Sequence, residues 1–71
     1  MNDTLSPGER LRTARLKTGF RQTDLARILG VAQSTIVYWE TNMRRPNLHA
    51  AIRMAALFGT TVENLFAEEA A

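Results

Sequence analysis

Apolar residues recur along this chain at spacings of three and four, which is the period of an α-helix. Leu25 and Leu29 lie four positions apart, and Ile36 and Trp39 lie three apart. Each pair therefore falls on one face of its own helix. Apolar and polar residues nowhere alternate with a period of two, so no strand is expected. The pattern predicts an all-α fold.

Capping residues and helix-stopping residues set the bounds of the predicted helices. Ser6 offers a hydroxyl N-cap, Pro7 suits the first helical position and Glu9 completes a capping box. Arg21 precedes the second helix without a side chain that accepts from free backbone N–H groups. The expected helices are 7–18, 22–29, 33–41, 48–58 and a short last helix capped by Thr61. Their expected stops, which readily adopt a left-handed backbone, are Gly19, Gly30, Asn42 and Gly59.

The inward faces of these five helices predict one compact bundle. The expected core residues are Leu11, Ala14, Leu25, Ala26, Leu29, Ile36, Trp39, Leu48, Ile52, Ala55 and either Leu57 or Phe58. A chain of 71 residues is near the size at which a single apolar core is only just sufficient. We therefore expect one domain over residues 1–71, with frayed ends at 1–5 and 67–71.

The second and third predicted helices form a helix-turn-helix at about 22–41, joined by a tight turn at Gly30 and Val31. Once the apolar face of the third helix is buried, its remaining residues point outward. They are Gln33, Ser34, Val37 and Tyr38. A helix that presents amide, hydroxyl and phenol groups near its N-terminus suits the reading of base edges in a major groove.

The order and spacing of short motifs across residues 8–66 resemble the Cro and phage-repressor type of helix-turn-helix regulator, the XRE family. The matching pieces are Gly8-Glu9-Arg10-Leu11-Arg12, Gly19-Phe20-Arg21-Gln22, Leu25-Ala26, Leu29-Gly30-Val31, Ser34-Thr35-Ile36, Trp39-Glu40, Arg44-Arg45-Pro46 and Phe58-Gly59 with Val62, Leu65 and Phe66. The resemblance implies a lambda-repressor-like DNA-binding domain that regulates transcription. Family members place a larger aliphatic residue at position 14, so Ala14 implies a gap unless Leu16 or Leu57 fills it.

The resemblance also assigns residues to double-stranded DNA. It implies base contacts by Gln33 and Ser34, with Thr35 in support. Glutamine can pair bidentately with adenine, and serine can bond to almost any base or phosphate. Tyr38 lies one turn further along the same face, where it contacts a base or the DNA backbone, or else packs on Arg44 or on the second helix.

Phosphate contacts are implied for Gln22, Arg44 and Arg45. Gln22 begins the second helix, where free N–H groups and the helix dipole favour an anion. The two arginines follow the recognition helix, and their guanidinium groups suit phosphate. The resemblance further implies a buried ion pair between Arg15 and Glu40, although a solvated surface glutamate is the alternative.

Charge along the chain agrees with a polyanionic partner. Residues 1–53 carry nine basic and four acidic side chains, a net charge of +5, whereas the remaining tail carries three glutamates and no base, a net of −3. A polyanion is drawn to the first part and repelled by the second. An ordinary solvated basic surface is the alternative interpretation of this distribution.

Several function classes find no support in the sequence. It holds no paired nucleophile and base, no glycine-rich phosphate loop and no cysteine, and His49 is its single histidine. We therefore expect no enzyme activity, no cofactor, no metal and no small-molecule ligand. No apolar run approaches the roughly 18 residues of a membrane span, so we expect a soluble cytoplasmic protein.

A module this small reads few base pairs, so we expect a homodimer on a palindromic operator. Leu65 and Phe66 are the expected interface residues, with Val62 internal; alternatively, all three close the monomer core. A protein-interaction module without a DNA role is the alternative function. Within the regulator class, a phage repressor, a restriction-modification controller and an antitoxin remain open, as do activation or repression and the operator sequence.

Overall fold

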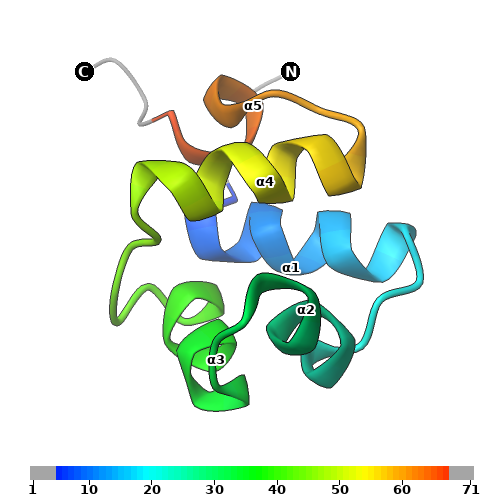
Figure 1. Ribbon diagram of the computed structural model, residues 1–71. Coiled ribbons are helices and arrows are strands. Elements are labelled where there is room, and N and C mark those ends of the chain that lie inside the picture. Colours follow the sequence, from blue (N-terminus) through cyan, green and yellow to red (C-terminus); the bar gives the residue numbers. More distant parts are fainter. Residues whose placement is uncertain (1–4, 68–71) are drawn as a thin grey trace.

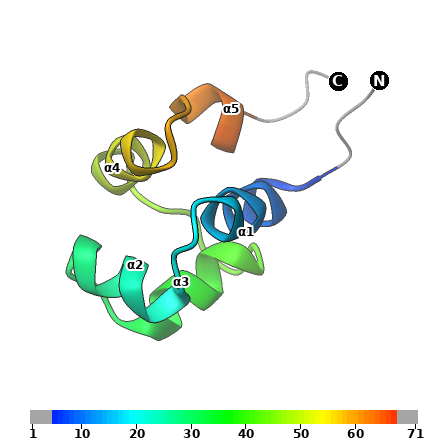
Figure 2. The same cartoon turned by 90° about the vertical axis from the view of Figure 1, so that its right-hand side faces the viewer.

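The computed structural model describes residues 5–67, which form five helices and no strand. In chain order they are α1 (Pro7–Lys17), α2 (Gln22–Leu29), α3 (Gln33–Glu40), α4 (Leu48–Phe58) and α5 (Val62–Phe66). In Figure 1, α1 crosses the middle of the molecule, with α4 and α5 above it and the α2–α3 pair below. Figure 2 shows the same three levels from the side. The predicted all-α, five-helix fold is confirmed for the described residues.

Local capping explains where these helices begin. The Ser6 hydroxyl accepts from the Glu9 N–H at 3.1 Å, and the Glu9 carboxylate accepts from the Ser6 N–H at 2.8 Å, so the predicted capping box of α1 is confirmed. Thr61 caps α5 by accepting from the Asn64 N–H at 3.0 Å. Three of the four predicted stops are left-handed glycines, and the fourth, Asn42, has a φ of 65°.

Helix α2 begins without a side-chain cap from Arg21, as its sequence indicated. Asp24 compensates for this, because its carboxylate accepts from the Arg21 backbone N–H at 2.9 Å. That backbone hydrogen bond, together with Arg21 and Arg27, lowers the pKa of Asp24 below its ordinary value. Asp24, the third residue of α2, therefore fixes the start of this helix by binding the backbone of the residue that precedes it.

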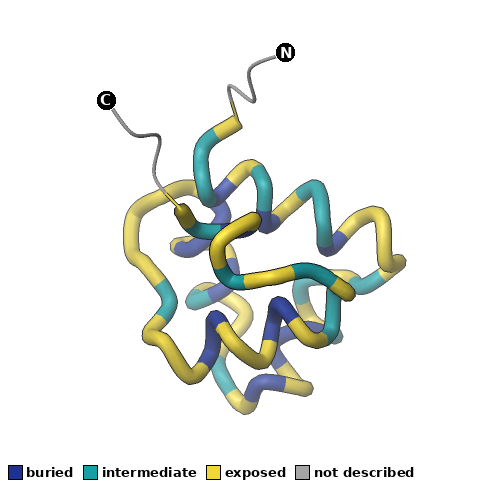
Figure 3. Tube along the Cα trace, turned by 90° about the horizontal axis from the view of Figure 1, so that it is seen from above, coloured by how far each residue is buried: buried dark blue, intermediate teal, exposed yellow. Residues whose placement is uncertain are grey.

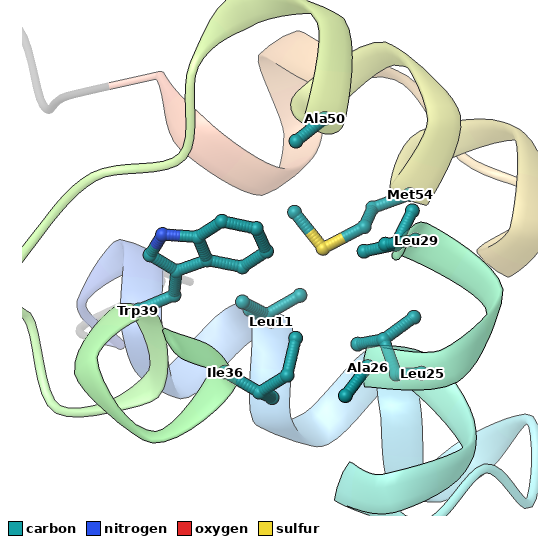
Figure 4. Close-up of a cluster of buried hydrophobic side chains, with 8 residues drawn as sticks. All are labelled: Leu11, Leu25, Ala26, Leu29, Ile36, Trp39, Ala50 and Met54. Carbon is teal, nitrogen blue, oxygen red and sulfur yellow. The ribbon is translucent and has the colours of Figure 1, made fainter. Parts of the chain in front are cut away.

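The core lies between α1, the α2–α3 pair and α4. Side chains from all four helices converge there in Figure 4, and four of them, Leu11, Leu25, Ile36 and Met54, are fully buried. Figure 3 shows buried positions recurring along the helices in view, with exposed ones between them. Predicted core residues that the structure confirms as buried are Leu11, Leu25, Ala26, Leu29, Ile36, Trp39 and Ala55.

The predicted inward face of α4 is wrong at Leu48 and Ile52. Leu48 is 69% exposed and Ile52 is 53% exposed, whereas the buried residues of this helix are Ala50, Ala51, Met54 and Ala55. Helix α4 carries two overlapping apolar stripes, and sequence reasoning favoured the one with the larger side chains. Alanines let the helix lie close to the core, and Met54 fills the space that remains beside Leu11 and Trp39.

A gap beside Ala14 is present, as expected. Ala14 is half-buried and lines a surface cleft of about 310 Å³, together with residues that include Phe58 and Leu65. Leu16 does not fill it, because its side chain is 55% exposed and lies outside this lining. Leu57 packs against the core instead.

The N-terminus of α1 lies directly against the end of α3. A Cβ atom added to buried Gly8 would lie 2.7 Å from the Trp39 carbonyl oxygen, so only glycine allows this approach. Asn42 completes the contact, because its Oδ1 accepts from the Gly8 N–H and its Nδ2 donates to the Ser6 hydroxyl, both at 2.9 Å.

The predicted fraying of 1–5 and 67–71 lies outside the described residues except at Leu5 and Ala67. Arg10 donates to the carbonyl oxygens of both, at 2.8 Å and 2.6 Å respectively, and to that of Leu65 at 3.0 Å. One arginine of α1 thus holds the two ends of the described chain. No helix within 5–67 has the length and apolar character needed to cross a bilayer.

Replacing Gly8 with alanine is expected to lower the free energy of unfolding by about 1–3 kcal/mol, the usual cost of overpacking. Helix propensity alone predicts the opposite sign, because alanine is favoured over glycine by roughly 1 kcal/mol. Chemical denaturation measures the change. Arg12→Ala, at an exposed position of the same helix, is the control and should cost under about 0.5 kcal/mol. A Gly8→Ala variant as stable as the wild type would contradict the close approach.

Candidate nucleic-acid interface

The α2–α3 unit is a helix, a tight turn and a second helix. Gly30 ends α2 with a φ of 73°, and the Val31 N–H then bonds the Ala26 carbonyl at 3.0 Å. Ala32 precedes α3 and supplies no side-chain cap. Leu25, Ala26 and Leu29 of α2 and Ile36 and Trp39 of α3 share the same buried core cluster, so the two helices are held as one body.

The outer face of α3 is polar, as predicted. Gln33, Ser34, Val37 and Tyr38 are exposed, while Thr35 is half-buried. Helix α3 lies at the lower end of the molecule in Figure 1, away from α4 and α5. A long partner can therefore approach this face without meeting the upper level of the fold.

Arg44 lies beside this face because the chain turns back after α3. The left-handed Asn42 makes the turn, and the Arg44 N–H bonds the Tyr38 carbonyl at 3.2 Å. The Arg44 guanidinium carbon lies 5.5 Å from the centre of the Tyr38 ring, a cation–π distance. Tyr38 thus packs on Arg44, the alternative named for it above, yet it stays 41% exposed. Arg45 is also exposed.

Arg15 and Glu40 form an ion pair in the interior, with side chains 7% and 3% exposed. The Arg15 Nε atom lies 2.5 Å from Glu40 Oε2, and Nη2 donates to Oε1 at 3.3 Å. The remaining Nη1 donates to the Phe20 carbonyl oxygen at 2.9 Å. The pair therefore connects α1 with α3 and with the loop that leads into α2.

Gln22 and Gln33, assigned above to a phosphate and to a base, lie side by side. Gln22 Nε2 donates to Glu40 Oε1 at 3.0 Å, and Gln33 Nε2 donates to Gln22 Oε1 at 3.3 Å. Both glutamines line a shallow polar cleft of about 460 Å³. The other residues of its lining are Arg12, Arg15, Arg21 and Thr23. The cleft brings the start of α2, the start of α3 and two exposed arginines to one place.

Leu65 requires a correction as an interface candidate. Its side chain is only 3% exposed, so it belongs to the interior of the described chain and has little surface left for a partner. On a five-residue helix one face must dock, and Leu65 occupies the centre of that face. Phe66 and Val62 are half-buried instead.

A separate apolar groove lies beside the α3–α4 loop. Its volume is about 380 Å³, and it is lined by Pro7, Gly8, Trp39, Asn42, Arg44, Arg45, Pro46, Leu48, Ala51, Val62 and Phe66. Leu48 and Ile52, the exposed pair on α4, are one helical turn apart at this side of the molecule. Sequence reasoning missed the groove, because it had assigned Leu48 and Ile52 to the core.

Two further roles were not visible in the sequence. The Asn42 side chain joins α3 to α1, where sequence reasoning expected only a left-handed turn residue. The hydrogen bond between Gln22 and Glu40 had no local signal, because the residues are 18 positions apart. Within residues 5–67, no group of three or more acidic, histidine or cysteine side chains is placed to hold a metal ion.

Comparison with known proteins gives consistent results. A family model described as "Helix-turn-helix" matches residues 11–65. An uncharacterized HTH-type transcriptional regulator of Archaeoglobus fulgidus is 39% identical over 57 residues, which are 80% of this chain and 81% of that protein.

Solved structures show the same fold. The P22 c2 repressor in complex with a synthetic operator has a TM-score of 0.83 at 27% identity, over 93% of this chain and 100% of that chain. SinR, described as the master regulator for biofilm formation and solved in complex with DNA, has a TM-score of 0.73 at 27% identity, over 83% of this chain and 95% of that chain.

Glu40→Ala is expected to lower the free energy of unfolding by about 3–5 kcal/mol, because it leaves Arg15 buried without its counter-ion. Glu63→Ala removes an exposed carboxylate from α5 and should cost under about 1 kcal/mol. Urea denaturation of both variants measures the difference. Equal effects of the two substitutions would contradict a buried pair.

Proposed function

Because the chain belongs to the helix-turn-helix family of DNA-binding transcriptional regulators, we propose that it binds a palindromic operator as a homodimer. The observation that carries the proposal is the exposed polar face of α3, with Arg44 at one end and the Gln22–Gln33 cleft at the other. We place the protein in the cytoplasm as one domain over residues 1–71. No catalytic step and no cofactor enters the proposal.

In this proposal α3 lies in the major groove and Gln33 and Ser34 contact base edges. Both side chains are exposed near the start of the helix, where a recognition helix meets the bases. Thr35 is half-buried and supports its neighbours. Tyr38 is held by Arg44 and contacts the DNA from one turn further along.

Phosphates on the two sides of that groove meet different parts of the site. Arg44 and Arg45 extend from the loop after α3, and their guanidinium groups bind phosphate oxygens on one side. Gln22 and the N–H groups at the start of α2 bind the backbone on the other side, beside Arg12 and Arg21 in the polar cleft. The net charge of +5 over residues 1–53 attracts the duplex to this surface.

A second copy of the chain is the proposed occupant of the apolar groove. Leu48 is 69% exposed at its edge, and half-buried Val62 and Phe66 line it, so a two-fold contact would bury apolar surface from both copies. Arg44 and Arg45 belong to the same lining, which would bring both copies' phosphate-binding loops together. Two recognition helices would then reach half-sites about 34 Å apart.

The way in which a substitution weakens DNA binding should depend on whether the residue contacts phosphates or bases. Alanine at Arg44 or Arg45 should weaken binding to all duplexes and reduce the salt slope by about one counterion each. Gln33→Ala should instead cost roughly 1–3 kcal/mol at particular base pairs and relax the preference there. Gel shifts at several salt concentrations, with operator and random duplexes, measure both effects. If all three variants lost operator and random binding in equal proportion, α3 would not be the reading helix.

Leu48→Glu should shift the protein from dimer toward monomer at micromolar concentration and weaken palindrome binding far more than half-site binding. The substitution buries a charge in the proposed contact while leaving the monomer core untouched. Leu16→Glu is the control, since it makes the same change at a leucine that is 55% exposed outside the groove. Sedimentation and gel shift provide the measurements. A wild-type monomer that binds one half-site as well as the palindrome would refute the dimer.

A further inference from the structure

We propose that Glu40, from inside the core, fixes which way the side-chain amide of Gln33 is turned and thereby restricts the base that Gln33 accepts to adenine. The inference rests on the proposed DNA-binding function and adds a positioning residue to it. Glu40 never touches DNA in this proposal. It acts through Gln22, the side chain that connects it to Gln33.

The first step is set by charge. A carboxylate accepts hydrogen bonds and cannot donate them, whereas a glutamine amide has one accepting end and one donating end. The Glu40 carboxylate pairs with the Arg15 guanidinium, and its Oε1 also accepts from Gln22 Nε2 at 3.0 Å. Gln22 must therefore turn its NH2 group toward Glu40. The carbonyl oxygen of Gln22 is left facing the other way.

The second step passes this orientation to the surface. The Gln22 carbonyl oxygen accepts from the Gln33 NH2 group at 3.3 Å. Gln33 is exposed, and the two orientations of its amide have nearly the same shape, so packing does not select between them. The bond from Gln22 selects the one that leaves the Gln33 carbonyl oxygen and a single N–H available.

That pattern of one acceptor and one donor matches adenine. In the major groove adenine offers the N7 acceptor and the N6 amino donor, whereas guanine offers two acceptors, N7 and O6. With its amide fixed, Gln33 would place a carbonyl oxygen against the O6 of guanine. With its amide free, it could turn and donate to guanine instead.

Two hydrogen bonds, from Gln22 to Glu40 and from Gln33 to Gln22, form a relay between the core and the surface. Two substitutions break this relay in different ways. Glu40→Gln introduces an amide whose oxygen accepts from Arg15 and whose NH2 group faces Gln22. The side-chain amides of Gln22 and Gln33 then both reverse their orientation. Gln22→Met removes the connection and keeps the Arg15–Glu40 pair, so the Gln33 amide is free to turn. The first variant should invert the preference for adenine and the second should relax it.

The experiment compares two duplexes that differ only at the base pair where Gln33→Ala has its largest effect. The measured quantity is the dissociation constant of the guanine duplex divided by that of the adenine duplex, both at the same salt concentration. This ratio is independent of the folded fraction and of phosphate contacts. The wild type should prefer adenine by roughly 5- to 150-fold, the range of a good bidentate pair. Glu40→Gln should prefer guanine, and Gln22→Met should bring the ratio close to one.

Glu63→Gln is the matched control. It makes the same chemical substitution and the same change of net charge at an exposed site on α5, so it should keep the wild-type ratio. A wild type that binds operator specifically while either relay variant keeps its ratio would overturn the inference and leave the proposed function standing. A wild type that prefers guanine would also overturn it. If Glu40→Gln fails to fold, an unchanged ratio in Gln22→Met still overturns the inference.

Absence of sequence-specific duplex binding by the wild type is a different result. It would overturn the proposed function itself, and the relay with it. The 7-deaza analogue of adenine adds an independent check, because it lacks the N7 acceptor to which the remaining Gln33 N–H donates. The wild type should lose affinity on this analogue, and Gln33→Ala should not.

Discussion

The buried pair between Arg15 and Glu40 is the interaction on which the arrangement of the lower helices depends. It joins α1 to α3. Arg15 also donates to the Phe20 carbonyl oxygen in the loop before α2, and Glu40 accepts a hydrogen bond from the Gln22 side chain. Such a pair adds little net stability, because desolvation of two charges offsets their attraction. Its effect is geometric, because the two-point contact between Arg15 and Glu40 fixes the orientation of the carboxylate that joins α3 to α1. Among the described residues, no buried side-chain polar atom lacks a partner, so this polar interior is satisfied.

A second constraint acts where α1 and α3 touch. Gly8 lets the backbone of α1 lie against the last residues of α3, and Asn42 bonds back to Gly8 and Ser6 at the point where the chain leaves α3. The same left-handed residue directs Arg44 back along the outer face of α3, beside Tyr38. The contact that locks the helix into the fold thus also sets the proposed phosphate-binding loop against the proposed reading face.

The surface has one polar and one apolar part because α3 and α4 each bury one side in the core and expose a side of different chemistry. Helix α3 buries Ile36 and Trp39 and leaves a polar face for DNA. Helix α4 buries alanines and Met54 and leaves Leu48 and Ile52 exposed, and Leu48 lines the groove proposed for a second copy. The two proposed surfaces share Arg44 and Arg45, which line the groove and also extend from the loop beside the outer face of α3.

What the sequence determined by itself was local. Helix bounds, caps and the turn at Gly30 depend on residues within about four positions of each other, so spacing and side-chain chemistry were enough to predict them. The polar face of α3 followed from the same periodicity. The face that α4 buries, the burial of Leu65 and the contact between Gln22 and Gln33 were decided only by the tertiary structure. Each depends on how far apart two helices lie, and that distance is set by residues distant in sequence, such as Gly8, whose effect no local pattern records.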